Sequence, residues 1–95
     1  AAHGLSVAPD GKTVYLTSQF TNDVTVIDVA TNKILKNITV GTNPNWIEFT
    51  SDGKFAIVSN TSSNDASIID IEKWKVVATV PVGKSPKRLW VANTK

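Results

Sequence analysis

The chain has 95 residues, of which 41% are hydrophobic and 19% charged, and it contains no cysteine and no methionine. A domain of this size buries a marginal core, and the lack of cysteine excludes disulfides and thiolate metal sites as additional support. The net charge of +2 comes from scattered side chains, and no apolar run approaches the roughly 20 residues of a membrane span, so we expect neither a nucleic-acid groove nor a membrane-spanning segment.

Four short stretches rich in β-branched residues follow one another in the first 41 residues. They cover residues 5–8, 13–17, 24–29 and 34–40. Turn residues separate them, and this pattern predicts four strands. Between the first two stretches, Asp10-Gly11 supplies a glycine that tolerates the positive φ of a tight hairpin. Asp28 ends the third stretch and is expected to accept backbone hydrogen bonds from the turn that follows.

The sequence matches itself without a gap when it is shifted by 42 positions, which pairs residues 1–53 with residues 43–95. Eleven of the 53 pairs are identical, including Asp10/Asp52, Gly11/Gly53 and Asp28/Asp70. The second copy therefore predicts strands over residues 47–50, 55–59, 67–71 and 76–82. A four-stranded repeat of this length is typical of β-propeller blades. A two-sheet sandwich is the alternative, although a sandwich does not require an ungapped repeat.

We therefore predict an all-β, partial β-propeller over residues 1–95, made of four-stranded antiparallel blades. Blade one is expected over residues 3–41, blade two over 45–83, and the first strand of a third blade over 87–95. Two blades cannot close a ring of roughly four to eight. The chain is thus expected to be a fragment of a larger ring, for which we expect seven blades, or a piece that completes a ring with other subunits. The predicted partners are the remaining blades or those subunits.

Several repeat motifs carry a family resemblance. Val40-Gly41-x-x-Pro44 precedes an apolar pair, Ser51-Asp52-Gly53-Lys54 forms a turn, and residues 24–28 read Val-Thr-Val-Ile-Asp. With these motifs the chain resembles the YVTN-type β-propeller repeat family, although the signature tetrapeptide is degenerate at residues 15–18 and 57–60. The resemblance implies a propeller fold. Similar repeats occur in cell-surface layer proteins, lactonase-like enzymes, quinoprotein dehydrogenase subunits and haem d1 propellers, so the fold does not choose a function.

One end of each blade is predicted to collect the side chains that suit a binding face. If the four strands alternate in direction, the loop between strands two and three shares an end with the connection between blades. Amide, aromatic and cationic groups gather there, and loops on a rigid scaffold are frequent binding sites. The candidate binding residues are His3, Asn45, Trp46, Asn60, Lys87 and Arg88. The alternative is that these are ordinary polar loop residues.

No catalytic or metal-ligating residue is assigned. His3 is the only histidine, so no Ser-His-Asp triad can be assigned, and a multi-histidine metal site cannot be built from this chain alone. The aspartates recur at the repeat period, which is typical of turn residues. His3 matches Asn45 and Lys87 at the entrance to the innermost strand, so a ring with more blades could share a metal or haem site there. The cofactor is left open.

The favoured function is a noncatalytic extracytoplasmic propeller, periplasmic or at the cell surface, that acts as a scaffold or as a protein or ligand interaction module. The lack of cysteine and the many Thr, Ser and Asn residues favour an exported protein, and association with the cell envelope fits this interpretation. The alternative is part of a propeller domain in a periplasmic redox enzyme of quinoprotein or haem d1 type, or in a lactonase-like hydrolase. In that case the active site would lie mainly on blades outside this segment.

Two further features can be tested against a structure. Asn37-Ile38-Thr39 and Asn60-Thr61-Ser62 match the acceptor pattern for N-glycosylation. Trp46 and Trp90 fall on or beside predicted inner strands and are expected to pack between blades. Trp74 falls at a hairpin tip and is expected to be more exposed.

Overall fold

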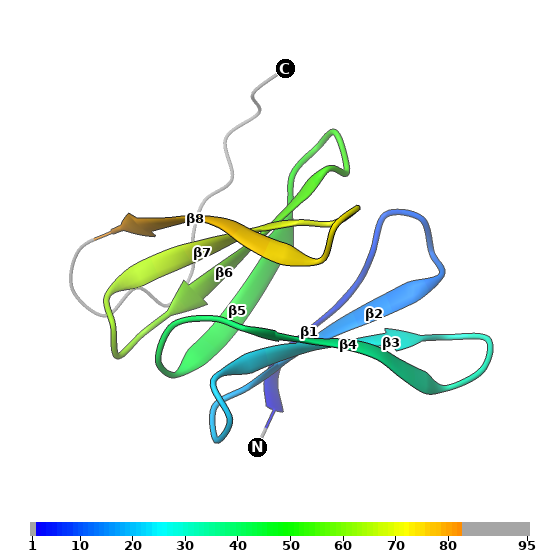
Figure 1. Cartoon of the computed structure of the whole chain (residues 1–95), viewed down its shortest axis with the longest axis horizontal. Coiled ribbons are helices and arrows are strands. Elements are labelled where there is room, and N and C mark those ends of the chain that lie inside the picture. Colours follow the sequence, from blue (N-terminus) through cyan, green and yellow to red (C-terminus); the bar gives the residue numbers. More distant parts are fainter. Residues whose placement is uncertain (1, 83–95) are drawn as a thin grey trace.

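The computed structural model describes the backbone of residues 2–82 and the side chains of residues 4–82. Its strands form two four-stranded antiparallel sheets in which spatial order follows sequence order (Figure 1). Blade 1 contains β1 (Ala2–Val7), β2 (Thr13–Ser18), β3 (Asp23–Asp28) and β4 (Lys33–Thr39), and blade 2 contains β5 (Pro44–Phe49), β6 (Phe55–Asn60), β7 (Asp65–Asp70) and β8 (Lys75–Pro81). The predicted all-β architecture is confirmed, while the strand predicted over residues 87–95 lies outside the described residues. Within residues 2–82, no helix has the length and apolar character needed to cross a membrane.

The hairpin between the first two strands of each blade forms as its Asp-Gly sequence predicts. Gly11 and Gly53 adopt φ angles of 71° and 72°, which residues with a Cβ adopt only at a steric cost. The Asp52 carboxylate accepts hydrogen bonds from the Thr50 hydroxyl at 2.6 Å and from the backbone N–H of Lys54 at 3.0 Å. These two bonds, that of Thr50 first, hold the pKa of the Asp52 carboxyl below its ordinary 3.8.

The aspartate at the end of the third strand closes the outer hairpin of each blade. The Asp28 carboxylate accepts a hydrogen bond from the backbone N–H of Thr31 at 3.2 Å. The Asp70 carboxylate accepts one from the backbone N–H of Lys73 at 3.1 Å. The predicted turn role of these aspartates is confirmed, and it accounts for their recurrence at the repeat period.

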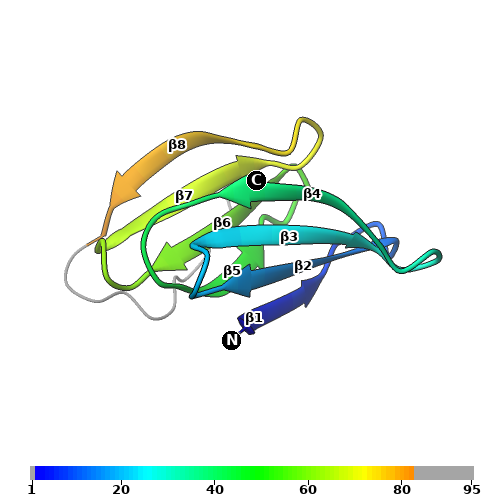
Figure 2. The same ribbon diagram turned by 60° about the horizontal axis from the view of Figure 1, so that its bottom comes forward.

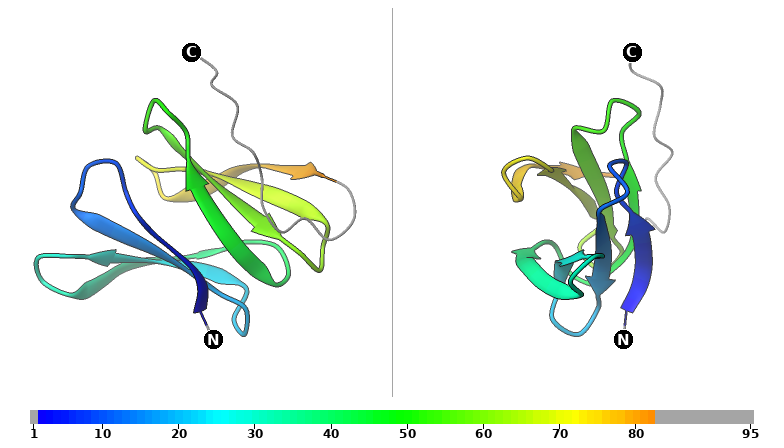
Figure 3. Two further views of the ribbon diagram at one scale, coloured as in Figure 1. Left: turned by 180° about the vertical axis from the view of Figure 1, so that it is seen from behind. Right: turned by 90° about the vertical axis from the view of Figure 1, so that its right-hand side faces the viewer.

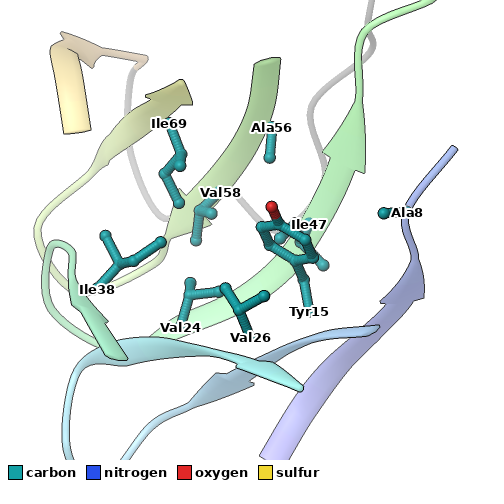
Figure 4. Packing of buried hydrophobic residues seen from close by; sticks show 9 residues of the cluster. All are labelled: Ala8, Tyr15, Val24, Val26, Ile38, Ile47, Ala56, Val58 and Ile69. Atoms are coloured by element: carbon teal, nitrogen blue, oxygen red, sulfur yellow. The ribbon is translucent and has the colours of Figure 1, made fainter. Parts of the chain in front are cut away.

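The two blades stack face to face. Their innermost strands, β1 and β5, lie next to each other, and their outermost strands, β4 and β8, approach each other at the opposite edge (Figures 2 and 3). Side chains alternate across each strand, so every second residue of β2 and β6 points into the space between the blades. The core that fills this space consists of Ala8, Tyr15, Val24, Val26 and Ile38 from blade 1 and Ile47, Ala56, Val58 and Ile69 from blade 2 (Figure 4).

Tyr15 lies at the centre of this interface and is fully buried. Its ring meets the ring of Phe49 edge to face, with centroids 5.1 Å apart and planes at 89°, a favoured aromatic geometry. Its hydroxyl accepts a hydrogen bond from Nε1 of Trp74 at 2.9 Å. Burial raises the pKa of the Tyr15 phenol above its ordinary 10.0.

The expectation that Trp74 would be more exposed than Trp46 is wrong. Trp74 is half-buried and packs against the inter-blade core, whereas Trp46 is 36% exposed. The reason is tertiary: the tip of the β7–β8 hairpin reaches across to blade 1, where Tyr15 offers a hydrogen-bond acceptor. Trp74 keeps this position although its φ is 53°. Trp90 lies outside the described residues.

Candidate functional site at the inner strands

Three connections meet at one end of the blades, which we call the loop end. The β4–β5 connection joins the β2–β3 loop through the backbone N–H of Asn43, which donates to Oδ1 of Asn22 at 2.9 Å. It joins the β6–β7 loop through the N–H of Thr42, which donates to Oγ of Ser63 at 3.0 Å, and through the N–H of Thr61, which donates to the Asn43 carbonyl at 3.0 Å. The predicted gathering of these loops at one end is confirmed.

Asparagine has a backbone role at the loop end. Asn22, Asn43 and Asn64 have φ angles of 55°, 61° and 55°. Asparagine tolerates this left-handed conformation better than other residues with a Cβ. The concentration of amides that marked this end in the sequence is therefore explained in part by chain geometry.

Both inner strands carry a β-bulge near the loop end. In β1, the pairing with β2 shifts between Ala2 and Leu5, and in β5 the pairing with β6 shifts between Pro44 and Trp46, so that Asn45 is the extra residue. The repeat places His3 at the position of Asn45. A bulge turns side chains out of the regular alternation and is frequent next to binding sites.

The two bulges differ in how they satisfy the neighbouring hydroxyl. In blade 1 the backbone N–H of Gly4 donates to Oγ1 of Thr17 at 2.6 Å, and both residues are buried. In blade 2 the repeat equivalents of Gly4 and Thr17 are Trp46 and Ser59, and the buried Ser59 hydroxyl has no hydrogen-bond partner. Glycine fits closely in blade 1, because a Cβ on Gly4 would lie 3.0 Å from Oγ1 of Thr17 and would require that side chain to shift slightly. At the equivalent position of blade 2, the inner strand β5 carries the indole of Trp46.

Asn60 is fully buried and belongs to the interior of blade 2 rather than to its surface. Its Nδ2 donates to Oδ1 of Asp65 at 2.9 Å and to Oγ of Ser67 at 3.0 Å. Gly41 passes so close that a Cβ there would lie 2.7 Å from Nδ2 of Asn60. The Asn60 amide is thus occupied by structural contacts, and its Oδ1 is buried without a partner.

A hollow of about 240 Å³ lies between the two inner strands, lined by Gly4, Leu5, Ser6, Trp46 and Ile47. Leu5 is 65% exposed, and Nε1 of Trp46 donates to Oε2 of Glu48 at 3.0 Å. An apolar wall with an indole suits a flat or apolar ligand held by contact and stacking. Of the predicted binding residues, Trp46 lines this hollow, Asn45 precedes it in the chain, and Asn60 is enclosed elsewhere. The side chains of His3, Lys87 and Arg88 lie outside the described residues.

Sequence reasoning missed Leu5, Ser6 and Glu48 as neighbours of Trp46. Glu48 follows Trp46 by two residues in β5, and this spacing puts both on one side of the strand. The spacing could therefore have predicted that Glu48 lies beside Trp46. The pairing of Trp46 with the β1 residues depends on how the blades stack, and no sequence signal gives it.

Two stacked four-stranded blades related by a 42-residue repeat define the chain as part of a β-propeller. The model of the cytochrome D1 heme domain family matches residues 1–89. The chain belongs to that family. This confirms the prediction of a propeller family, whereas the YVTN-type label remains a prediction. None of the curated proteins compared matches the chain in sequence.

Solved structures agree on the fold. Hydrazine synthase of Kuenenia stuttgartiensis is 29% identical, with a TM-score of 0.86, over 90% of this chain and 24% of that one. The dihydro-haem d1 dehydrogenase NirN, solved in complex with DHE, is 24% identical, with a TM-score of 0.82, over 97% of this chain and 21% of that one. A candidate 6-phosphogluconolactonase from Bacteroides uniformis is 17% identical, with a TM-score of 0.75, over 84% of this chain and 26% of that one. The chain therefore spans about a quarter or less of these neighbours.

The family name implies a haem, and the described side chains do not fit an iron site on their own. Haem iron takes a histidine, cysteine, methionine or tyrosine ligand. Among residues 4–82 the one such side chain is Tyr15, whose hydroxyl is enclosed between the blades and bonded to Trp74. No group of three His, Cys, Asp or Glu side chains in the described part could hold a metal ion. What these residues do offer is the hollow beside Trp46, which Leu5 and Ile47 also line.

The structure separates the two N-glycosylation motifs. Asn37 is exposed on the outer strand β4, where its Oδ1 accepts a hydrogen bond from the Thr25 hydroxyl at 2.8 Å. Asn60 is fully buried. If the folded chain is presented to an oligosaccharyltransferase in a eukaryotic secretory pathway, we expect modification at Asn37 and none at Asn60. Peptide mass mapping measures this, with Asn37→Gln and Asn60→Gln as matched controls. A glycan on Asn60 would contradict the burial of its amide.

Proposed function

We propose that the chain supplies two blades of a haem d1-type propeller domain in an extracytoplasmic redox protein, with the reactive site mainly on blades outside this segment. The observation that carries the proposal is the match of the cytochrome D1 heme domain model over residues 1–89, which runs through both blades. The further blades come from the same polypeptide or from other subunits. A periplasmic location follows from the same assignment and is part of the proposal.

Within such a domain, the part of this segment that faces the bound group is the hollow between β1 and β5. Trp46 offers an indole at the edge of that hollow, and Leu5 and Ile47 offer apolar walls. A haem would supply redox chemistry when bound, and these side chains would contact one edge of the ring and keep water from it. His3, Lys87 and Arg88 are proposed to add polar contacts at the inner-strand entrance. No proton transfer or ligand bond is assigned to them.

A noncatalytic scaffold or interaction module, including one at the cell surface, is the second candidate. It is favoured by the loop end, where Asn22, Asn43 and Asn60 are used in hydrogen bonds that hold the connections together. Side chains used in this way leave fewer groups for a ligand. The two candidates differ in whether the protein holds a chromophore.

The test is the visible absorption spectrum of the protein that contains this segment, purified from its natural source, together with its denatured mass. The expected result is a tetrapyrrole band that is released by acidic extraction. Trp46→Ala is expected to lower the occupancy several-fold, whereas Phe20→Ala, at an exposed loop residue away from the hollow, leaves it unchanged. A protein with no chromophore that also takes up none on titration with haem d1 would contradict the proposal and leave the scaffold function.

A further inference from the structure

The two Asp-Gly turns of the repeat have the same backbone. Gly11 and Gly53 have φ angles of 71° and 72°. The backbone N–H of each glycine donates to a carbonyl three residues earlier, that of Ala8 in blade 1 and that of Thr50 in blade 2, at 2.9 Å in both. The aspartates before these glycines are both exposed. A difference in reactivity between the two turns is therefore expected to come from their side chains.

The two aspartates differ in how their carboxylates are held. Asp10 and Asp52 each accept a hydrogen bond from the backbone N–H of the lysine two residues later, at 2.8 and 3.0 Å. Asp52 also accepts one from the Thr50 hydroxyl, at 2.6 Å. Blade 1 has Ala8 at the position of Thr50, and none of the described side chains donates to the Asp10 carboxylate. Asp10 thus has one restraint where Asp52 has two.

An aspartate followed by glycine can rearrange, because glycine has no Cβ to hinder attack by its backbone nitrogen. That nitrogen bonds to Cγ of the aspartate, and water leaves, formed from the carboxyl OH and the amide proton. The product is a five-membered succinimide ring. A second water then cleaves the bond between this nitrogen and the main-chain carbonyl carbon. The main chain now runs through Cγ, as an isoaspartyl linkage, with no net change in mass.

The Thr50 hydroxyl opposes two requirements of this reaction at Asp52. The carboxyl must turn toward the next backbone nitrogen, and at Asp52 this breaks a short bond to Thr50 as well as the bond to Lys54. Hydrogen bonds to an ionised group are stronger than those between neutral groups. The carboxyl must also be protonated to lose water, and the Thr50 bond first holds the pKa of Asp52 below its ordinary value, which lowers the protonated fraction at any given pH.

We propose that Asp10-Gly11 is a site of aspartyl isomerisation, and that the Thr50 hydroxyl protects Asp52-Gly53 from the same reaction. The new linkage adds one atom to the main chain of the hairpin between β1 and β2. It also exposes an α-carboxylate, the group that an isoaspartyl methyltransferase esterifies with S-adenosylmethionine. The proposal goes beyond the proposed haem function and does not depend on it.

The first experiment ages the folded protein that contains this segment near neutral pH. Peptide mapping with electron-transfer fragmentation distinguishes the two linkages, and labelling by isoaspartyl methyltransferase counts them. We expect isoaspartate to accumulate several-fold faster at Asp10 than at Asp52, and at similar rates at both sites in the denatured protein. Asp10→Ser is expected to remove the signal from that peptide. Equal rates in the folded protein, or no conversion at Asp10 while the denatured protein reacts, would overturn the proposal.

The second experiment tests the protecting hydroxyl. Thr50→Val keeps the volume of the side chain and removes the hydroxyl, so the rate at Asp52 should rise toward that at Asp10. Thr50→Ser keeps the hydroxyl and should leave Asp52 protected. The Thr50 hydroxyl also accepts a hydrogen bond from the Phe55 N–H at 3.1 Å, so amide hydrogen exchange at Phe55 measures any loosening of the turn.

Pro9→Ser controls for the other difference between the turns, since blade 2 has Ser51 at the position of Pro9. We expect this variant to keep the faster reaction at Asp10. If the excess at Asp10 disappeared in Pro9→Ser, the residue before the aspartate would be the cause. An unchanged rate at Asp52 in Thr50→Val would show that the hydroxyl does not protect it. Either result would contradict the proposed role of Thr50.

Discussion

Replacement of Tyr15 by alanine is expected to lower the free energy of unfolding by about 3–5 kcal/mol, as for other large aromatic core residues. Tyr15 is fully buried, packs edge to face on Phe49 and accepts a hydrogen bond from Trp74. Its loss leaves a cavity at the centre of the contact between the blades. Since native proteins have total stabilities of roughly 5–15 kcal/mol, this loss is a large share of the free energy of unfolding, and the urea midpoint should fall markedly. Urea denaturation followed by circular dichroism measures the change.

Tyr15→Phe is the matched control for this experiment. It keeps the ring that contacts Phe49 and removes the hydroxyl, which leaves the Trp74 indole N–H without its acceptor at a cost of about 1–3 kcal/mol. The comparison should be made at one fixed protein concentration, so that any association contributes equally to each variant. A Tyr15→Ala chain with an unchanged urea midpoint would show that the two blades do not pack on each other as described.

Gly41→Ala is expected to destabilise the chain by about 1–3 kcal/mol, as for other overpacking substitutions. A Cβ at Gly41 would lie 2.6 Å from Oγ of Ser63 and 2.7 and 2.8 Å from Nδ2 and Cγ of Asn60. Asn60 cannot swing away, because it is fully buried and its amide is bonded to Asp65. The clash must therefore move the β4–β5 connection, which links the two blades.

Gly11→Ala serves as the comparison because its cost has a different origin. Nothing lies within 4 Å of a Cβ at Gly11, but its φ of 71° disfavours any residue with a Cβ by about 1–2 kcal/mol. The two variants are distinguished by the side-chain amide resonances of Asn60, which should shift in Gly41→Ala and stay in place in Gly11→Ala. Unchanged stability in Gly41→Ala would mean that the connection does not press on Asn60.

Local features were predictable because short-range chemistry decides them. Asp-Gly at residues 10–11 and 52–53 predicted the hairpin turns, and the aspartates at positions 28 and 70 predicted hydrogen bonds into the turns that follow. The ungapped repeat predicted two four-stranded blades, and strand alternation predicted which loops share an end. Each of these predictions depends only on a few neighbouring residues or on the repeat period, and both can be read from the sequence.

The site was less predictable because exposure depends on how the blades stack. Asn60 was predicted as a binding residue from its place at the loop end, but it is buried because β4 passes into β5 directly above it at Gly41. Trp74 was expected to be exposed at a hairpin tip, but the stacking of blade 2 on blade 1 brings it to the Tyr15 hydroxyl. The repeat equivalents of Asn60 and Trp74 in blade 1 are Ser18 and Asn32, so the repeat gives no signal for either contact.

The sequence by itself determined the number of strands, the turns between them and the division into two blades, since hydrophobic alternation, turn chemistry and the repeat are all written along the chain. The tertiary structure alone decided which of the two tryptophans faces solvent and that Trp46 lines a hollow with residues of β1. The physical reason is that burial is a property of two surfaces in contact. The pattern of residues along the chain predicts which side chains form each blade surface. Only the packing of one blade on the next shows which two surfaces bury each other.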